Sequence, residues 1–211
     1  MNISILNDFI NEVSDKFKNG ESKPDVKSYL ESKRVSIYDI DKIFREANRK
    51  ILAEFSDNAI KLIHNKSSKE DVYQFIAKDL PEELARSVLN EVISKYKSQT
   101  KAQVFKVVTL TNDYSDLIKS VANEFISETE VKEWIVYYFS TIQKRQKSKR
   151  KNEVVAGVAL IMLGLIITLG TYYFAVLSGG GKYLMSYGPI IAGLIAIGKG
   201  MTTDIVEVPE L

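Results

Sequence analysis

The sequence predicts an all-α protein in which a cytosolic helical-repeat domain precedes a C-terminal two-helix transmembrane hairpin. Three observations support this fold class. The stretch Val154–Leu177 contains no Asp, Glu, Lys or Arg over 24 residues. Six of the eight residues Lys144–Lys151, shortly before it, are basic. Within residues 1–143, apolar residues recur at helical spacing, and one segment resembles another.

The resemblance within residues 1–143 indicates a repeated helical unit. "NGESKPDVKSYL" (19–30) matches "NKSSKEDVYQFI" (65–76) at an offset of 46 residues, and "SETEVKEWI" (127–135) is a weaker third copy. We expect copies at about 3–54, 55–97 and 114–143. The pairs that carry the match are Phe9/Phe55, Asn19/Asn65, Ser22/Ser68, Lys23/Lys69, Asp25/Asp71 and Val26/Val72, followed, with one residue deleted, by Ile43/Val88, Phe44/Leu89 and Ala47/Val92.

Each copy places a serine three residues before an acid, which is typical of a helix N-cap. The hydroxyl accepts an N–H from the first turn, and the acid favours the positive end of the helix dipole. The predicted caps are Ser22, Ser68 and Ser127. The helices predicted around them are 3–19, 23–33 and 37–55 in the first copy, 55–65, 69–79 and 81–97 in the second, and 114–126 and 128–144 in the third. "VFKVVTLT" (104–111) is the one strand-like stretch, or else a linker.

The uncharged stretch Val154–Leu177 predicts a membrane span. As a helix it would be ~36 Å long, against ~30 Å of hydrocarbon. A buried core helix is the alternative, although such helices seldom stay apolar on every face for this length. The predicted segments are a basic flank at 144–153, a hairpin at 154–203 and a tail at 204–211.

A second apolar segment, Tyr183–Gly198, follows the turn "SGGGK" (178–182). Its 16 residues give only ~24 Å of helix, but it reaches Thr203 if Lys199 extends its amine to the surface. The helix is expected to start near Pro189 or to bend there. A re-entrant half-span is the alternative to a full crossing.

The basic flank predicts orientation, because cations beside a span stay on the cytoplasmic side. It comprises Lys144, Arg145, Lys147, Lys149, Arg150 and Lys151. Both termini are therefore expected in the cytoplasm. Nucleic-acid binding or nuclear targeting is another use of such a cluster. Residues 1–143 hold 21 basic and 23 acidic residues, however, so no nucleic-acid partner is expected.

Aromatic residues are expected to form belts at the two membrane interfaces. The outer belt comprises Tyr172, Tyr173, Phe174, Tyr183 and Tyr187. The inner belt comprises Trp134, Tyr137, Tyr138 and Phe139.

Small residues form a stripe on each apolar helix, where they would let helix backbones approach closely in lipid. The second helix carries Gly188, Ala192, Ala196 and Gly200 at four-residue spacing, and the first carries Gly157, Gly164 and Thr171 at seven-residue spacing. These stripes either close the hairpin on itself or contact a neighbouring subunit.

No catalytic motif is found in the sequence, and an enzyme, a metal and a cofactor are not expected. Its one histidine, His64, falls near the end of a predicted helix, where a surface or capping role is usual. There is no cysteine, which excludes disulfides and suits a reducing compartment. "GGGK" at 179–182 is no phosphate loop, because no strand precedes it.

The hairpin resembles that of small bacterial two-span membrane proteins with no established activity. The residues that carry the resemblance are Thr171-Tyr172, Gly179–Gly181, Tyr183 and "GPIIAG" (188–193), with Pro189 as the departure. With the basic flank it covers ~60 residues, and it implies a bacterial inner-membrane location. No family known to us covers the N-terminal repeats.

Two functions fit these features. The first is a membrane-anchored, non-enzymatic protein whose helical repeats bind a cytosolic protein partner at the inner face of the membrane. The second is an oligomeric two-span effector that forms a pore or disrupts the bilayer in stress or phage defence. Membrane lipid is an expected partner in both, and the second adds a homo-oligomer.

Overall fold

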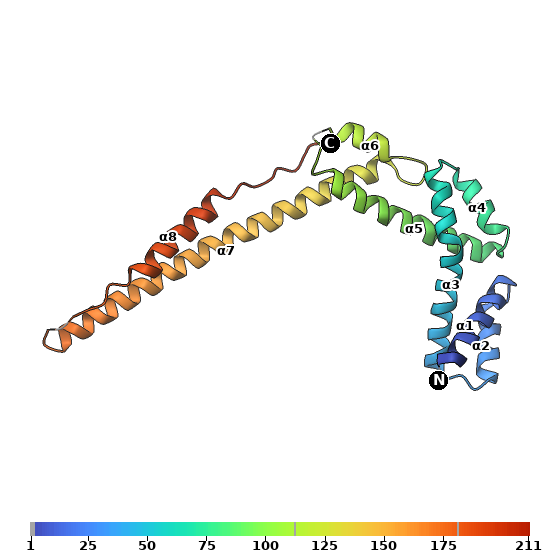
Figure 1. Ribbon diagram of the computed structural model, residues 1–211, viewed down its shortest axis with the longest axis horizontal. Coiled ribbons are helices and arrows are strands. Elements are labelled where there is room, and N and C mark those ends of the chain that lie inside the picture. Colours follow the sequence, from blue (N-terminus) through green and yellow to red (C-terminus); the bar gives the residue numbers. More distant parts are fainter. Residues whose placement is uncertain (1–2, 112, 181) are drawn as a thin grey trace. The chain divides into compact units, whose positions relative to one another are not determined.

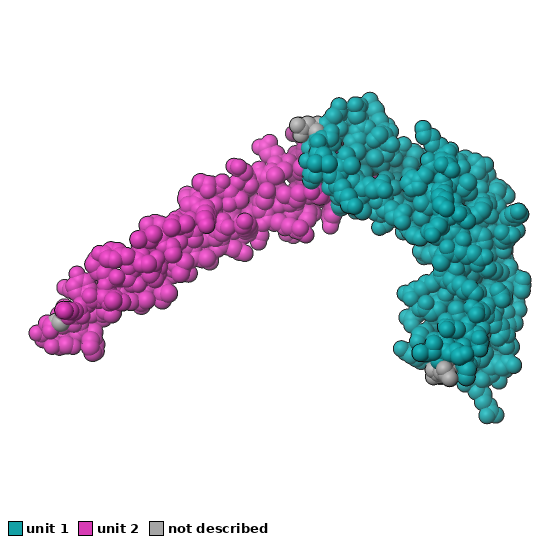
Figure 2. Space-filling view, in the orientation of Figure 1, with its two compact units in different colours: residues 1–131 teal, residues 132–211 magenta. Residues whose placement is uncertain are grey.

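A computed structural model describes residues 3–111, 113–180 and 182–211. Within these ranges the chain forms eight helices and no strand, so the all-α prediction is confirmed (Figure 1). The chain divides into two compact units, Met1–Val131 and Lys132–Leu211, which Figure 2 colours separately. The boundary lies earlier than the expected one at residue 143.

The first three helices, α1 (Ile3–Lys18), α2 (Lys23–Ser32) and the N-terminal half of α3 (Ile37–His64), form a small bundle. Its core is apolar and closed to water, and the rings of Phe17 and Phe44 lie 5.6 Å apart at its edge. The fully buried residues of this core include Val13, Val26, Leu30, Ile43 and Ala47.

A second bundle of the same order follows along the chain. It consists of the C-terminal half of α3, α4 (Lys69–Ala77) and α5 (Glu82–Val107), which pack on one another. Five of the paired positions are buried in both bundles, as the exposures of Val26 and Val72, both 0%, illustrate, whereas Phe9 is half-buried and its counterpart Phe55 is buried. The other paired core positions, all at most 6% exposed, are Leu30/Ile76, Ile43/Val88, Phe44/Leu89 and Ala47/Val92. The repeat relationship itself stays a prediction, but equal burial at equivalent positions is what it requires.

Several predicted boundaries were wrong. The expected helices 37–55 and 55–65 are one helix, α3, because Phe55 is 5% exposed and lies on the buried face that runs through the junction. Helix α5 continues past residue 97 to Val107, so the strand-like stretch 104–111 begins as helix. Helix α6 (Tyr114–Val121) stops before 126, where Asn123 and Ile126 form an isolated antiparallel bridge.

Turns of one design join α1 to α2, α2 to α3 and α3 to α4. A residue with positive φ ends each helix, and two residues later a serine caps the next. The positive-φ residues are Gly20 (84°), Arg34 (61°) and Lys66 (62°), and the caps that follow are Ser22, Ser36 and Ser68. The cap at Ser36 has no counterpart among the predictions.

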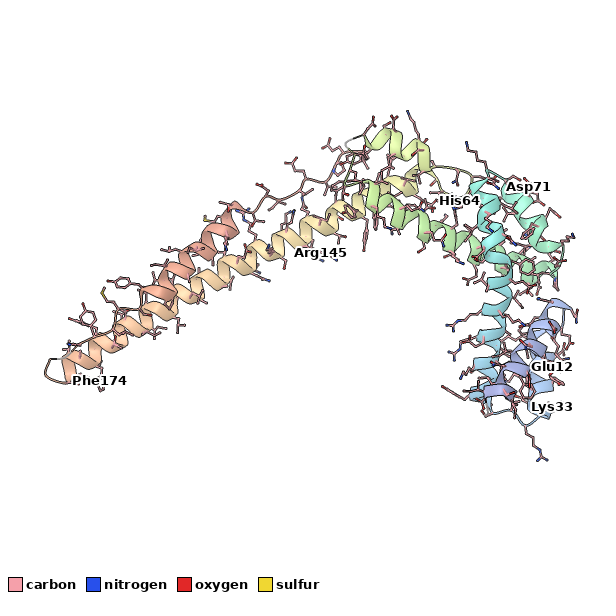
Figure 3. The ribbon with its side chains drawn as sticks, in the orientation of Figure 1. Glu12, Lys33, His64, Asp71, Arg145 and Phe174 are labelled. Atoms are coloured by element: carbon pink, nitrogen blue, oxygen red, sulfur yellow. The ribbon has the colours of Figure 1, made fainter. Side chains whose placement is uncertain are left out.

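The Ser68 cap is a full capping box. Its hydroxyl accepts the Asp71 N–H at 3.1 Å, and the Asp71 carboxylate accepts the Ser68 N–H at 3.0 Å. These hydrogen bonds from Ser68 lower the pKa of Asp71, which Figure 3 labels. Ser127 and Glu130 repeat the arrangement at the start of α7 (Glu128–Leu177), where the two N–H bonds are 3.2 and 3.0 Å long.

Helix α7 runs without interruption for 50 residues, or ~75 Å. It contains the whole basic flank and the whole first apolar stretch, so the helix predicted at 128–144 continues directly into that stretch. It ends at Leu177, after which Gly179 (φ 78°) and Gly180 (φ 104°) reverse the chain; Gly181 lies outside the described residues.

Helix α8 (Tyr187–Thr202) begins four residues later than Tyr183, where the second apolar segment starts. Pro189 is its third residue, a position where the missing N–H costs no helical hydrogen bond, so no bend is needed. Residues 182–186 approach it in a non-helical conformation.

Candidate functional site: the apolar segments of α7 and α8

The C-terminal half of α7 is apolar and largely exposed. Among the described residues, α7 is the one helix long and apolar enough to cross a membrane, and 11% of its most apolar 18-residue window is buried. A core helix of a soluble protein would be mostly buried there. The large apolar residues of this half that are at least 43% exposed are Val155, Val158, Met162, Leu163, Leu165, Ile166, Leu169, Phe174, Val176 and Leu177.

Helix α8 packs against α7 in antiparallel register through glycines. A Cβ added at Gly157 would lie 2.6 Å from the Gly193 carbonyl oxygen, and one at Gly193 would lie 2.5 Å from that of Gly157. The helices also approach closely one heptad away on each side, although less so, since a Cβ at Gly164 would lie 3.2 Å from Ser186 O and one at Gly200 would lie 3.0 Å from Arg150 O. The backbones therefore touch at Gly157 and Gly193, where a Cβ would overlap the facing carbonyl oxygen, and they approach closely at Gly164 and Gly200.

This seam corrects the stripe predicted for the second helix. Gly157, Gly164 and Gly200 lie in it, but Gly188 and Ala192 are exposed, and Ala196 is half-buried beside it. The glycine that the prediction missed is Gly193. The partners on both helices recur every seven residues rather than every four, which is the spacing that shallow left-handed helix crossings follow.

Two threonines of α7 hydrogen-bond the non-helical segment before α8. The hydroxyl of Thr171 lies within hydrogen-bonding distance of Leu184 O (3.0 Å) and of Ile167 O in its own helix (2.9 Å), and it accepts the Leu184 N–H at 3.3 Å. Thr168 Oγ1 accepts the Ser186 N–H at 3.1 Å. Backbone groups outside a helix need such partners wherever water is absent.

The polar half of α7 carries all six predicted flank residues, and each is exposed; Figure 3 labels Arg145. Beside them, the chain after α8 is fixed by two glutamines. The Gln146 side chain accepts the Val206 N–H at 2.8 Å, and the Gln143 amide donates to Val206 O at 3.3 Å. The chain thus returns from the glycine turn past the whole apolar stretch to the basic end of α7.

The predicted aromatic belts differ in their geometry. At the turn, Tyr172 and Tyr183 meet edge to face with centroids 5.5 Å apart, and Tyr173, Phe174 and Tyr187 are 57–73% exposed. The expected inner belt at residues 134–139 stays a prediction, and these residues precede the apolar stretch by several helical turns. Because α7 is continuous, Tyr137 lies ~25 Å along the helix from Val154.

The predicted histidine lies in the first unit, at the end of α3 (Figure 3). His64 is exposed and lies edge to face with Tyr96, with ring centroids 5.4 Å apart. A cavity of about 630 Å³ opens beside these rings. No three of the His, Asp and Glu residues in the described part of the chain are grouped closely enough to hold a metal ion.

Comparisons with known proteins add little. No family model matches the chain, and no solved structure matches it. The alanine–tRNA ligase of Wigglesworthia glossinidia brevipalpis is 28% identical over 102 residues, which are 48% of this chain and 12% of the ligase. The match is too low and too partial to place the chain in that family. The molecule is thus defined here as an all-helical protein with one candidate membrane-spanning helix.

Proposed function

We propose that this protein is a non-enzymatic membrane anchor, in which α7 and α8 cross a bacterial inner membrane as a hairpin and the helical unit binds a protein partner in the cytoplasm. The observation that carries the proposal is the exposed, uncharged half of α7. A continuous apolar surface of this length is costly in water and is favourable in lipid.

The length of the seam supports two full crossings. From Val154, beside Gly200, to Thr171, beside Leu184, the seam on α7 rises ~26 Å, and the uncharged stretch continues to Leu177, against ~30 Å of hydrocarbon. Helix α8 alone has 16 residues. The flanking residues supply the remaining length, and the Thr168 and Thr171 hydroxyls satisfy the backbone of one flank as lipid requires. A re-entrant half-span would leave the tail on the other side from Gln143 and Gln146.

The cations support a cytoplasmic location for both termini. The six exposed cations of α7 and the tail held by Gln143 and Gln146 lie at one end of the hairpin. The other end carries Lys182 alone. Cations beside a span stay in the cytoplasm, so the glycine turn faces outward.

Reporter fusions test this topology. A reporter after Leu211 is expected to be active in the cytoplasm, and one inserted at Gly180 is expected to be active outside. The matched control replaces the six flank cations by Gln, which should scramble the orientation without changing expression. A cytoplasmic signal from the Gly180 fusion would refute two crossings. Recovery of both fusion proteins in the soluble fraction, after membranes are removed by centrifugation, would refute the anchor.

A partner surface is supported by apolar residues at the start of α3. Ile37 and Tyr38 are 70% and 76% exposed. We expect the double variant Ile37→Ser/Tyr38→Ser to lose a partner that the full chain captures in detergent. The control Lys42→Gln, which changes an exposed side chain on the same helix, should still capture it. Capture that is equal in all three proteins would rule out this surface.

The second candidate is an oligomeric membrane effector. It is favoured by Gly188 and Ala192, which do not face α7 and leave small residues on the lipid side of α8. Ala192→Leu is expected to abolish crosslinked oligomers in membranes, together with any toxicity on overexpression, whereas Ile195→Leu on the same helix should change neither. If the Ala192→Leu variant crosslinks as the parent protein does, the oligomeric effector is refuted and the membrane-anchor function is retained.

A further inference from the structure

The first unit contains a cavity that the anchor function does not use. It opens between the end of α3, the turn before α4, α5, and the C-terminal end of α6 with the chain that follows it, all within residues 63–125. Its volume of about 630 Å³ lies within the usual range of pockets for small molecules.

One wall of the cavity is an ordered stack of rings. Tyr96, which is 5% exposed, lies edge to face with His64 on one side and with Phe125 on the other, at centroid distances of 5.4 and 6.2 Å. Rings in such a stack are held in place by their neighbours. The wall therefore presents mainly the exposed His64 ring, which packs on the nearly buried Tyr96 ring.

Asn123 fixes the adjoining turn to this wall. Its amide oxygen accepts the Phe125 and Ile126 N–H groups at 2.8 and 3.1 Å, and its amide nitrogen donates to the Tyr96 hydroxyl at 2.9 Å. The Tyr96 oxygen is thereby an acceptor, and its own proton has no acceptor among the described residues. That proton remains available to a bound group.

The charge of the lining is positive. Lys66 and Lys119 both line the cavity, and neither has an ion-pair partner in the part of the chain that the structure describes. The one lining carboxylate, Glu124, already accepts the Lys69 N–H at 3.0 Å. The lining thus offers several donors and two cations against one carboxylate.

We propose that this cavity binds a small anionic ligand with a flat ring, whose phosphate or carboxylate oxygens contact Lys66 and Lys119 and whose ring lies against the His64–Tyr96 wall. The cations supply charge-assisted hydrogen bonds to the oxygens. The Tyr96 hydroxyl donates to the same ligand. Donors alone would suit any anion, and the aromatic wall adds the preference for a ring.

Calorimetric titration of the full chain in a neutral detergent tests the site with three probes. Adenosine monophosphate carries both the ring and the anion, adenosine carries only the ring, and inorganic phosphate carries only the anion. The monophosphate is expected to bind, and the other two at least about tenfold more weakly, since each lacks one of the two contacts. Binding of adenosine as tight as that of its monophosphate, or no binding of the monophosphate, overturns the proposal.

Substitutions then locate the site. Lys66→Gln/Lys119→Gln should weaken the monophosphate at least about tenfold, because charged hydrogen bonds are lost while the side chains keep their approximate size. Tyr96→Phe keeps the ring wall and removes the hydroxyl, so it should weaken binding less. The exposed Lys42, remote from the lining, provides the control Lys42→Gln. Unchanged affinity in the double variant, or an equal loss in the control, refutes this location.

Discussion

The close approach of Gly157 to Gly193 allows a sharp test of the α7–α8 seam. Replacing Gly157 by Ala places a Cβ 2.6 Å from the Gly193 carbonyl oxygen and 2.6 Å from Ile197 Cγ1. Ordinary contact needs ~3.5–4.0 Å, so the helices must separate locally by about 1 Å. A gap of that size loses about a quarter to a half of the attraction between facing atoms. Added bulk in a well-packed site typically costs about 1–3 kcal/mol.

Gly170→Ala and Gly198→Ala are the matched controls, one on each helix. A Cβ at either position meets no described atom within 4 Å. Both should preserve the seam, and alanine favours the helix by about 1 kcal/mol over glycine.

Spin labels report the outcome directly, because the chain has no cysteine of its own. Val158 and Ile191 are exposed on the two helices, at 48% and 54%, and accept labels without touching the seam. The parent protein should give one short distance in lipid vesicles. Gly157→Ala should add a broad, longer component, and the controls should not. A parent-like distance in Gly157→Ala, or equal broadening in Gly170→Ala, would refute the reasoning.

Three further predictions concern the first unit, each measured by unfolding the full chain in a neutral detergent. Arg34→Gly and Lys66→Gly should each stabilise the first unit by about 0.5–1 kcal/mol, since glycine adopts positive φ without strain. Asn65 has a φ of −80°, so the control Asn65→Gly should destabilise the unit. Stabilisation by all three substitutions would contradict this explanation. Ser68→Ala should cost about 1 kcal/mol and Ser68→Thr much less, because Thr keeps the capping oxygen; equal losses would argue against the cap. The lowered pKa of Glu130, caused first by the hydrogen bond from Lys97 and then by that from Ser127, stabilises the fold above the ordinary pKa of 4.5. That contribution should fade as the pH falls through the lowered pKa, so the stability difference between the parent protein and Glu130→Gln should shrink in acid; a difference constant down to pH 2 would contradict it.

Local rules made the helix starts predictable. A serine followed three residues later by an acid marks an N-cap wherever it stands, because the cap needs only its own first turn. Ser22, Ser68 and Ser127 could therefore be found from sequence, and Ser36 with Asp39 carries the same signal. Helix ends were less predictable. Arg34 and Lys66 adopt positive φ although neither is a glycine, so the residue types at these positions did not predict the turns.

The charge-free stretch 154–177 and the basic run before it are facts of composition, and the sequence by itself determined them. It also determined that the chain is helical, because the spacing of apolar residues is a property of the chain alone.

Only tertiary structure decided which small residues meet. Four-residue spacing selected Gly188 and Ala192, whereas the heptad register of two crossing helices selects Gly193, and that register depends on both helices and on the length of the turn between them. Packing also joined two predicted helices into α3, since the junction at Phe55 carries no breaking residue and its buried face continues through it. The cavity beside Tyr96 was likewise beyond sequence, because its walls come from segments up to 62 residues apart, Ile63 to Phe125.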